Sequence, residues 1–210
     1  QITVGSIVLV SFRNKDYKAI IVSTHTNSKI KNIKHIKRYL NITLNKNQID
    51  YLQKLAISNR LNIGILLFKF VDISVLKNQK IANTQKISNI SMSKFTAFDK
   101  TKNNVFFVPS LKIAKELNNY LSDYLEIDFY QRYGGNEELD KNFRNRFKNI
   151  ILLNTNFEKV NIDTKTNYYF YDSNNTAWKL PRLNHLNVVE SAYIKNNIFG
   201  GNFNFINYFP

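Results

Sequence analysis

Residues 105–125, VFFVPSLKIAKELNNYLSDYL, place an apolar strand directly before an amphipathic helix. VFFVP, residues 105–109, is rich in β-branched and aromatic side chains, as buried strands are. Ser110 then provides a hydroxyl that can cap the first turn of the helix. This stretch therefore predicts one strand–helix unit of an α/β fold.

The same alternation continues to the end of the sequence. IDFY (127–130), IILLN (150–154) and YYFY (168–171) are predicted strands. NEELDKNFRNRFK (136–148) and LNVVESAYIK (186–195) are predicted helices. Continuous apolar strands that alternate with helices indicate a parallel sheet covered on both faces. In such sheets function lies at the carboxyl ends of the strands, where Asp172 follows YYFY.

The tail GGNFNFINYFP (200–210) alternates aromatic residues with asparagine. It could stack nucleic-acid bases, but a strand that packs its aromatic face is the favoured interpretation.

The amino-terminal part has a different pattern. ITVGSIVLVSF (2–12) and YKAIIVSTH (17–25) are β-rich and enclose the polar RNKD, which predicts a hairpin. The apolar residues of SKIKNIKHIKRYL (28–40) recur with spacings of 3, 3 and 4, which by periodicity alone favours a helix. NQIDYLQKLAIS (47–58) is a firmer amphipathic helix. ILLFKFV (65–71) is a buried segment of either type.

Residues 76–104 have weak periodicity and are rich in Asn, Lys, Ser and Thr, so they are predicted to be a linker or boundary. The predicted fold class is thus α+β / α/β: a small β-rich domain over residues 1–75, followed by a parallel α/β half over residues 105–210.

Charge is the most marked feature of the composition. The formal net charge is +15, which favours a polyanionic partner, nucleic acid first. Residues encoded by AT-rich codons are abundant, so part of the lysine content can reflect codon drift. The absence of cysteine excludes disulfides and thiolate zinc sites. No apolar run is long enough for a membrane span, and a cytoplasmic location is expected.

Three short stretches carry a family resemblance. GSIVLVSFR (5–13) is similar to a G-x-x-V-x-V-P-F-G strand, KHIKRYLN (34–41) to K-x-I-x-x-V-L-D, and SNRLNIGILL (58–67) to the end of a helix, Y-Y-x-x-P-L-G-x-V-L. Together they resemble the amino-terminal DNA-binding domain of the replication-restart helicases, the primosomal protein N′ (PriA) family. The resemblance implies a strand, not a helix, over residues 30–40. It also implies DNA contact by residues of these strands and of the basic run: Phe12, Arg13, Lys29, Lys31, Lys34, Lys37 and Arg38.

The basic run has an alternative interpretation, a solvated sheet edge that lysines guard against aggregation. DNA contact is favoured because the domain that it resembles binds DNA. Arg13 stands where the family has a glycine, which puts the family's pocket for a DNA 3′ end in doubt.

A second resemblance concerns the first RecA-like helicase lobe. VPSLKIAKE (108–116) and NTNFE (154–158) are similar to two of its motifs. DSNN, at Asp172, Ser173, Asn174 and Asn175, takes the place of the acidic D-E-x-H-type box that holds magnesium and orients water. The glycine-rich phosphate loop should fall within residues 76–104, where nothing resembles it. The lobe is therefore expected to be degenerate, without catalytic residues, metal or cofactor.

These observations predict a DNA-binding protein that recognises branched or 3′-ended DNA in replication restart and has no ATPase activity. Its expected partners are forked or 3′-ended DNA and other replication or primosome proteins, and no membrane. Two alternatives remain: an ATPase completed in trans by a partner that carries the phosphate loop, and a scaffold that docks replication proteins.

Overall fold

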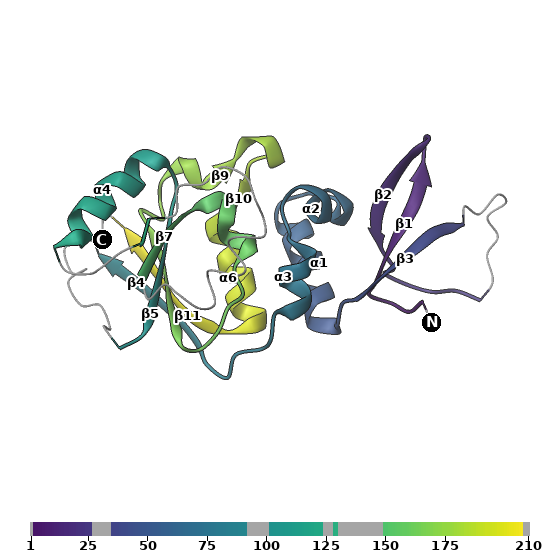
Figure 1. The fold of residues 1–210 in the computed structure, drawn as a ribbon, viewed down its shortest axis with the longest axis horizontal. Coiled ribbons are helices and arrows are strands. Elements are labelled where there is room, and N and C mark those ends of the chain that lie inside the picture. Colours follow the sequence, from purple (N-terminus) through teal and green to yellow (C-terminus); the bar gives the residue numbers. More distant parts are fainter. Residues whose placement is uncertain (1, 27–34, 92–100, 124–127, 130–148, 208–210) are drawn as a thin grey trace. The chain divides into compact units, whose positions relative to one another are not determined.

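The computed structural model describes residues 2–26, 35–91, 101–123, 128–129 and 149–207 (Figure 1). The chain divides into two compact units, Gln1–Asn78 and Gln79–Pro210. The elements of the first unit are β1 (Ser6–Phe12), β2 (Lys15–Ile20), β3 (Ile36–Thr43), α1 (Lys46–Ser58), α2 (Ile63–Lys69) and α3 (Ile73–Asn78).

The strands of the first unit form an antiparallel sheet in the order β2-β1-β3. The predicted hairpin is confirmed, and so is the strand that the family resemblance implied, over Ile36–Thr43. The helical periodicity was misleading there because Ile36 is exposed and pairs with Val10 of β1 instead of facing a helical core. Residues 30–34, including Lys34, lie outside the described residues.

Two residues, Arg13 and Asn14, form the turn between β1 and β2, since Phe12 pairs with Lys15. Their φ angles are 49° and 59°. Positive φ at both central positions defines a type I′ turn, which suits the right-handed twist of a hairpin but favours Asn and Gly. Arginine has a Cβ and is strained in this region. The glycine of the family motif would fit the position without strain.

Changing Arg13 to glycine should therefore stabilise the hairpin locally by about 1 kcal/mol, because it relieves the left-handed strain. That gain would slow hydrogen exchange of the hairpin amides by about fivefold. Exchange measured by mass spectrometry over peptides from β1 and β2 tests it. Asn14→Gly is the matched control and should gain less, because asparagine already tolerates this conformation. If the hairpin amides of Arg13→Gly exchange as fast as those of the wild type or faster, Arg13 is not strained in this turn.

Helices cover the other part of the first unit. The predicted helix α1 is confirmed and begins with a capping box, in which the Asn45 and Gln48 side chains each bond the other residue's backbone N–H. The buried Gln48 amide also donates to the carbonyl oxygens of Leu76 (2.8 Å) and Lys77 (3.1 Å), which ties α1 to the end of α3. The ambiguous apolar segment 65–71 is mostly helical, since α2 runs over Ile63–Lys69.

The second unit contains a parallel sheet. Within the described residues its strand order is β4-β11-β8-β5-β7-β6, and every pairing is parallel. Its elements are β4 (Gln85–Ser91), β5 (Asn103–Val108), α4 (Leu111–Ser122), β6 (Asp128–Phe129), β7 (Asn149–Leu153), the 3₁₀ helix η2 (Asn154–Lys159), β8 (Thr166–Tyr171), η3 (Thr176–Trp178), β9 (Lys179–Leu180), η4 (Pro181–Leu183), β10 (Leu186–Asn187), α6 (Val188–Phe199) and β11 (Gly201–Asn207). Strands β9 and β10 form a separate antiparallel pair.

The predicted α/β half is confirmed. The apolar residues of VFFVP, IILLN and YYFY lie in β5, β7 and β8, which are buried neighbours. Helix α4 packs on one face of the sheet, against Phe106, Ile151 and Tyr169. Helix α6 packs on the other, where its Tyr193 stacks on Phe205 of β11 at 4.2 Å between ring centroids. The described part of the tail thus forms the strand β11 and buries the aromatic rings of Phe203 and Phe205, as favoured from the sequence. Residues 208–210 and the predicted helix 136–148 lie outside the described residues.

The predicted linker over residues 76–104 needs a correction. It contains β4, a full strand that pairs with β11 from Gln85 to Ser91. Its polar composition hid it because β4 is an edge strand and most of its side chains are exposed or half-buried. The backbone ladder with β11 holds it in place, together with the half-buried Ile90, which packs against the core of the sheet. The division between compact units falls between Asn78 and Gln79.

A buried ion pair links α6 to η2 in the second unit. Lys195 of α6 and Glu158 of η2 are both buried, and their Nζ and Oε2 atoms lie 3.3 Å apart. The same ammonium donates to the Val160 carbonyl oxygen at 3.3 Å and lies 4.7 Å from the centre of the Phe157 ring. The charge is therefore surrounded by a carboxylate, a carbonyl and an aromatic face.

Candidate nucleic-acid interface

The β1–β2 hairpin and the start of β3 carry the predicted DNA-binding residues that the structure describes. Every residue from Ser11 to Lys18 is exposed. In an antiparallel sheet, residues paired across strands lie on the same face. The register therefore assigns each side chain of the hairpin to one of two faces.

One face is polar and basic. Leu9 pairs with Lys18 on one side and with Arg38 on the other, so the two cations lie on the same face. Nearer the turn, Ser11 pairs with Asp16. A bulge in β3 inserts one extra residue, Lys37, between the residues that pair with Leu9 and Val10. Both cations that the sequence predicted at the end of the basic run thus lie at this sheet edge.

Lys37 is held by an acid on β2. Its Nζ atom lies 2.6 Å from Oδ2 of Asp16, and the Ser11 hydroxyl donates to the other carboxylate oxygen at 2.7 Å. The hydrogen bond from Lys37, followed by that from Ser11, lowers the pKa of Asp16. Part of the positive charge at this edge is therefore neutralised within the sheet. Within the described part of the chain, neither Lys18 nor Arg38 forms an ion pair.

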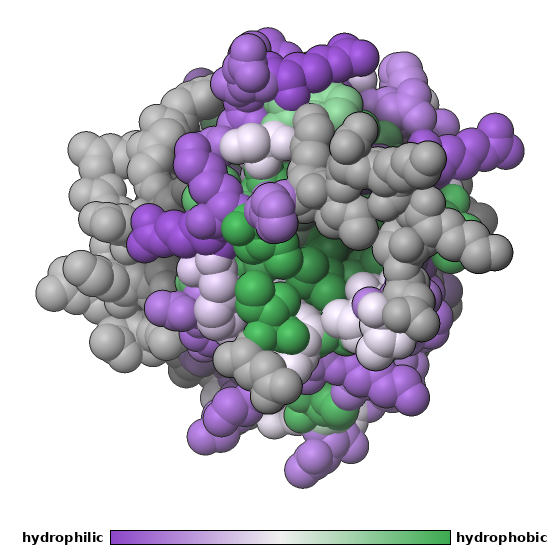
Figure 2. Space-filling view, turned by 90° about the vertical axis from the view of Figure 1, so that its right-hand side faces the viewer, coloured by the Kyte–Doolittle hydropathy of each residue, from purple (hydrophilic) through white to green (hydrophobic). Residues whose placement is uncertain are grey.

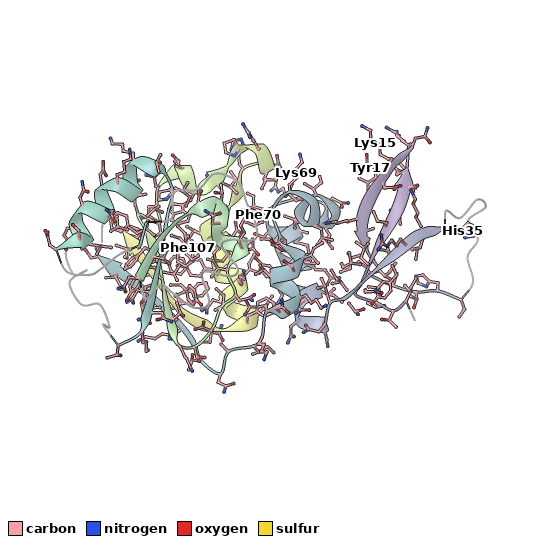
Figure 3. All side chains as sticks on the ribbon, in the orientation of Figure 1. Lys15, Tyr17, His35, Lys69, Phe70 and Phe107 are labelled. Atoms are coloured by element: carbon pink, nitrogen blue, oxygen red, sulfur yellow. The ribbon has the colours of Figure 1, made fainter. Side chains whose placement is uncertain are left out.

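The opposite face carries aromatic and apolar side chains. Val10 pairs with both Tyr17 and Ile36, and Phe12 lies two residues further along β1 on the same face. The Phe12 and Tyr17 rings meet edge to face at 6.5 Å between centroids. The guanidinium of Arg13 lies 5.3 Å from the centre of the Phe12 ring. Figure 3 shows Lys15 and Tyr17 on β2, and His35 beside the start of β3.

These apolar side chains are unusually open to solvent. Phe12 is 51% exposed, Tyr17 41% and Ile36 38%. Figure 2 shows a hydrophobic area bordered by hydrophilic residues on one face of the molecule. The hairpin therefore offers a basic polar face and an aromatic face at once.

Of the predicted contact residues, the structure brings four together in this sheet: Phe12, Arg13, Lys37 and Arg38. Lys29, Lys31 and Lys34 lie outside the described residues. The sequence interpretation missed the β2 residues from Lys15 to Lys18. Their signal was weak, because KDYK mixes both charges with an aromatic residue and does not form a basic run.

The second predicted site, at the end of β8, is a turn. Asp172 has a φ of 54°, and its carboxylate accepts a hydrogen bond from the Asn175 side chain at 2.7 Å. Its carbonyl oxygen accepts from Trp178 Nε1 at 2.8 Å. The Ser173 hydroxyl donates to the Asn207 side chain of β11. Asn174 is exposed, and Asn175 also caps η3. Asp172 follows β8 at its carboxyl end, as predicted, and its carboxylate is engaged within the turn.

Within the described ranges, no group of three or more His, Cys, Asp or Glu side chains is placed to hold a metal ion. None of the helices in the described part of the chain is long and apolar enough to cross a membrane.

The amino-terminal part of the chain matches a known protein family. Residues 1–71 match the family model of the PriA 3′DNA-binding domain (3′BD). This range includes the whole β-sheet of the first unit, α1 and α2. No curated protein matches the chain. The amino-terminal part of the chain is therefore a PriA-like 3′ DNA-binding domain, and the family match does not extend to the α/β unit.

Proposed function

We propose that this chain recognises branched or 3′-ended DNA in replication restart, and that it does so without hydrolysing ATP. The match of residues 1–71 to a 3′DNA-binding domain carries the proposal. The exposed cations of the hairpin sheet support it, since a row of cations at a sheet edge can contact phosphates. In this proposal the contact residues are Phe12, Arg13, Lys29, Lys31, Lys34, Lys37 and Arg38. Other primosome proteins are its proposed protein partners.

Preference for a DNA end is tested by titrating the full chain with labelled DNAs of equal length. A fork with a recessed 3′ end is compared with a blunt duplex and with the same fork whose 3′ hydroxyl is blocked by a phosphate. Loss of one hydrogen bond to the hydroxyl would weaken binding by about two- to tenfold. We expect the lower end of that range, because Arg13 replaces the motif glycine. Equal affinity for fork and blunt duplex would overturn the structural preference.

In the proposal the α/β unit is a degenerate helicase lobe. Its parallel sheet supports a relationship to such a lobe at the level of fold class only. The strand end that would carry the acidic box holds Asp172 in a hydrogen-bonded turn with Asn175. Ser173, which takes the place of the water-orienting glutamate, bonds a neighbouring strand.

The pure protein is therefore expected to release no phosphate from ATP, with or without DNA. Ser173→Glu should not restore hydrolysis, because a single added carboxylate does not supply a phosphate cradle. A coupled phosphate-release assay at saturating fork DNA measures this, with an active helicase as the positive control. DNA-stimulated release by the wild-type protein would instead support the alternative of an ATPase.

A further inference from the structure

The exposed aromatic face of the hairpin is larger than its own folding requires. A cross-strand aromatic pair does stabilise a hairpin, and Phe12 with Tyr17 does so here. Yet both rings keep about half of their surface in contact with water, with exposed fractions of 51% and 41%. Exposed aromatic residues that gather at one place of a surface often mark a binding site.

The charges around the two rings indicate what could bind there. Arg13 lies over the Phe12 ring, and Lys15 pairs with Phe12 across the strands. Asp16, the one acid between residues 11 and 20, belongs to the opposite face and is paired with Lys37. A ligand of this face thus meets ring surfaces and positive charges together, which suits a chain with a phosphate backbone and exposed π-faces.

We infer that the Phe12–Tyr17 face of the hairpin binds unpaired bases of single-stranded DNA by stacking, while Arg13 and Lys15 contact the adjoining phosphates. Duplex DNA does not fit this role, since its bases are stacked on one another and their faces are closed. The assignment rests on the proposed function and adds to it the class of DNA segment that this face takes: the unpaired strand at a fork or beside an end.

Two substitutions of Tyr17 distinguish the contribution of the aromatic ring to binding from that of apolar surface alone. Tyr17→Leu keeps an apolar side chain on the strand but removes the ring, whereas Tyr17→Phe keeps the ring. Loss of one stacked base weakens binding by at least about fivefold. Tyr17→Leu should therefore bind single-stranded oligothymidine at least about fivefold more weakly than wild type, and Tyr17→Phe should bind as wild type does. Circular dichroism confirms that both variants are folded.

A fluorescent reporter tests stacking directly. The chain has one tryptophan, Trp178, which is 1% exposed and lies in the other compact unit. Phe12→Trp adds a second indole on the hairpin face, and stacking of a base on it should quench its emission when oligothymidine is added. Blunt duplex at the same concentration should leave that emission nearly unchanged.

The outcomes distinguish this inference from the proposed function. If wild type binds forks and Tyr17→Leu binds oligothymidine equally well, the stacking inference fails while the proposed function stands. If wild type binds no DNA at all, both fail. Vesicles containing one third phosphatidylserine provide the competing probe. Loss of vesicle binding by Tyr17→Leu, with unchanged oligothymidine binding, would assign the face to an anionic membrane and overturn the inference.

Discussion

Lys195→Ala should destabilise the 79–210 unit by about 3–5 kcal/mol, the range found when one partner of a buried ion pair is removed. The substitution leaves the Glu158 carboxylate buried without its ammonium partner. It also removes the hydrogen bond to the Val160 carbonyl and the contact with the Phe157 ring. Desolvation of the remaining charge dominates the loss, because a buried carboxylate loses the water that would otherwise stabilise it.

Urea unfolding, monitored by the fluorescence of Trp178, measures this loss of stability in the 79–210 unit. The indole is buried and donates to the Asp172 carbonyl oxygen at 2.8 Å, so its emission reports unfolding of its own unit. Lys112→Ala is the matched control. That lysine lies 4.0 Å from Glu116, with side-chain exposures of 87% and 53%, and its loss should change stability by no more than about 0.5 kcal/mol.

A second substitution separates charge from packing. In the double variant Lys195→Met with Glu158→Gln, neither side chain is charged and most of the buried volume is kept. It should recover a large part of the loss, since a buried ion pair can be replaced by well-packed neutral residues at little cost. If Lys195→Ala is no more destabilising than Lys112→Ala, the buried charge does not contribute as the geometry implies.

The parallel sheet could be predicted from the sequence because its strands are apolar on both faces. The same property conceals their register, since a shift by one residue exchanges two equally apolar faces. Three buried asparagines specify the strand register, which the apolar pattern does not. Asn104 pairs in register with Asn149 and Asn167, donates to the first at 2.8 Å and accepts from the second at 3.3 Å. Such a row is unremarkable in the sequence, because its members are 45 and 63 positions apart.

The candidate interface was predictable only in part for a related reason. A run of cations is visible in the sequence, so Lys37 and Arg38 could be predicted from it. The ion pair of Lys37 with Asp16 spans 21 positions and depends on the order β2-β1-β3. Lys18 was missed because it approaches Arg38 only across β1. Pairing between distant strands, and not local composition, decides which cations can contact DNA phosphates.

The second large expected effect is a loss of DNA affinity when Lys18 and Arg38 are removed. The double variant Lys18→Ala with Arg38→Ala should weaken DNA binding by about one to two orders of magnitude near 0.1 M salt, and should flatten the log–log salt slope by about two. Each phosphate-bound cation releases a counterion from DNA, so its loss reduces both quantities. The control is Lys46→Ala with Lys54→Ala on α1, which removes the same net charge from the same unit. Fluorescence anisotropy of the full chain at several salt concentrations measures the slopes.

Asp16→Asn should act in the opposite direction. It removes a negative charge from the basic face and releases Lys37 from the 2.6 Å ion pair, so it should tighten binding and steepen the slope by up to about one. Adding Lys37→Ala should cancel most of that gain, which makes the two substitutions a double-mutant cycle. The pKa of Asp16 is lowered, so the carboxylate is charged at neutral pH and the difference from the Asn variant should shrink only in acid, as the carboxylate gains its proton.

If Lys18→Ala with Arg38→Ala changes the slope no more than the α1 control, the phosphate contacts lie on other cations of the chain. If Asp16→Asn also leaves affinity unchanged, the basic face of the hairpin is not the DNA-binding face.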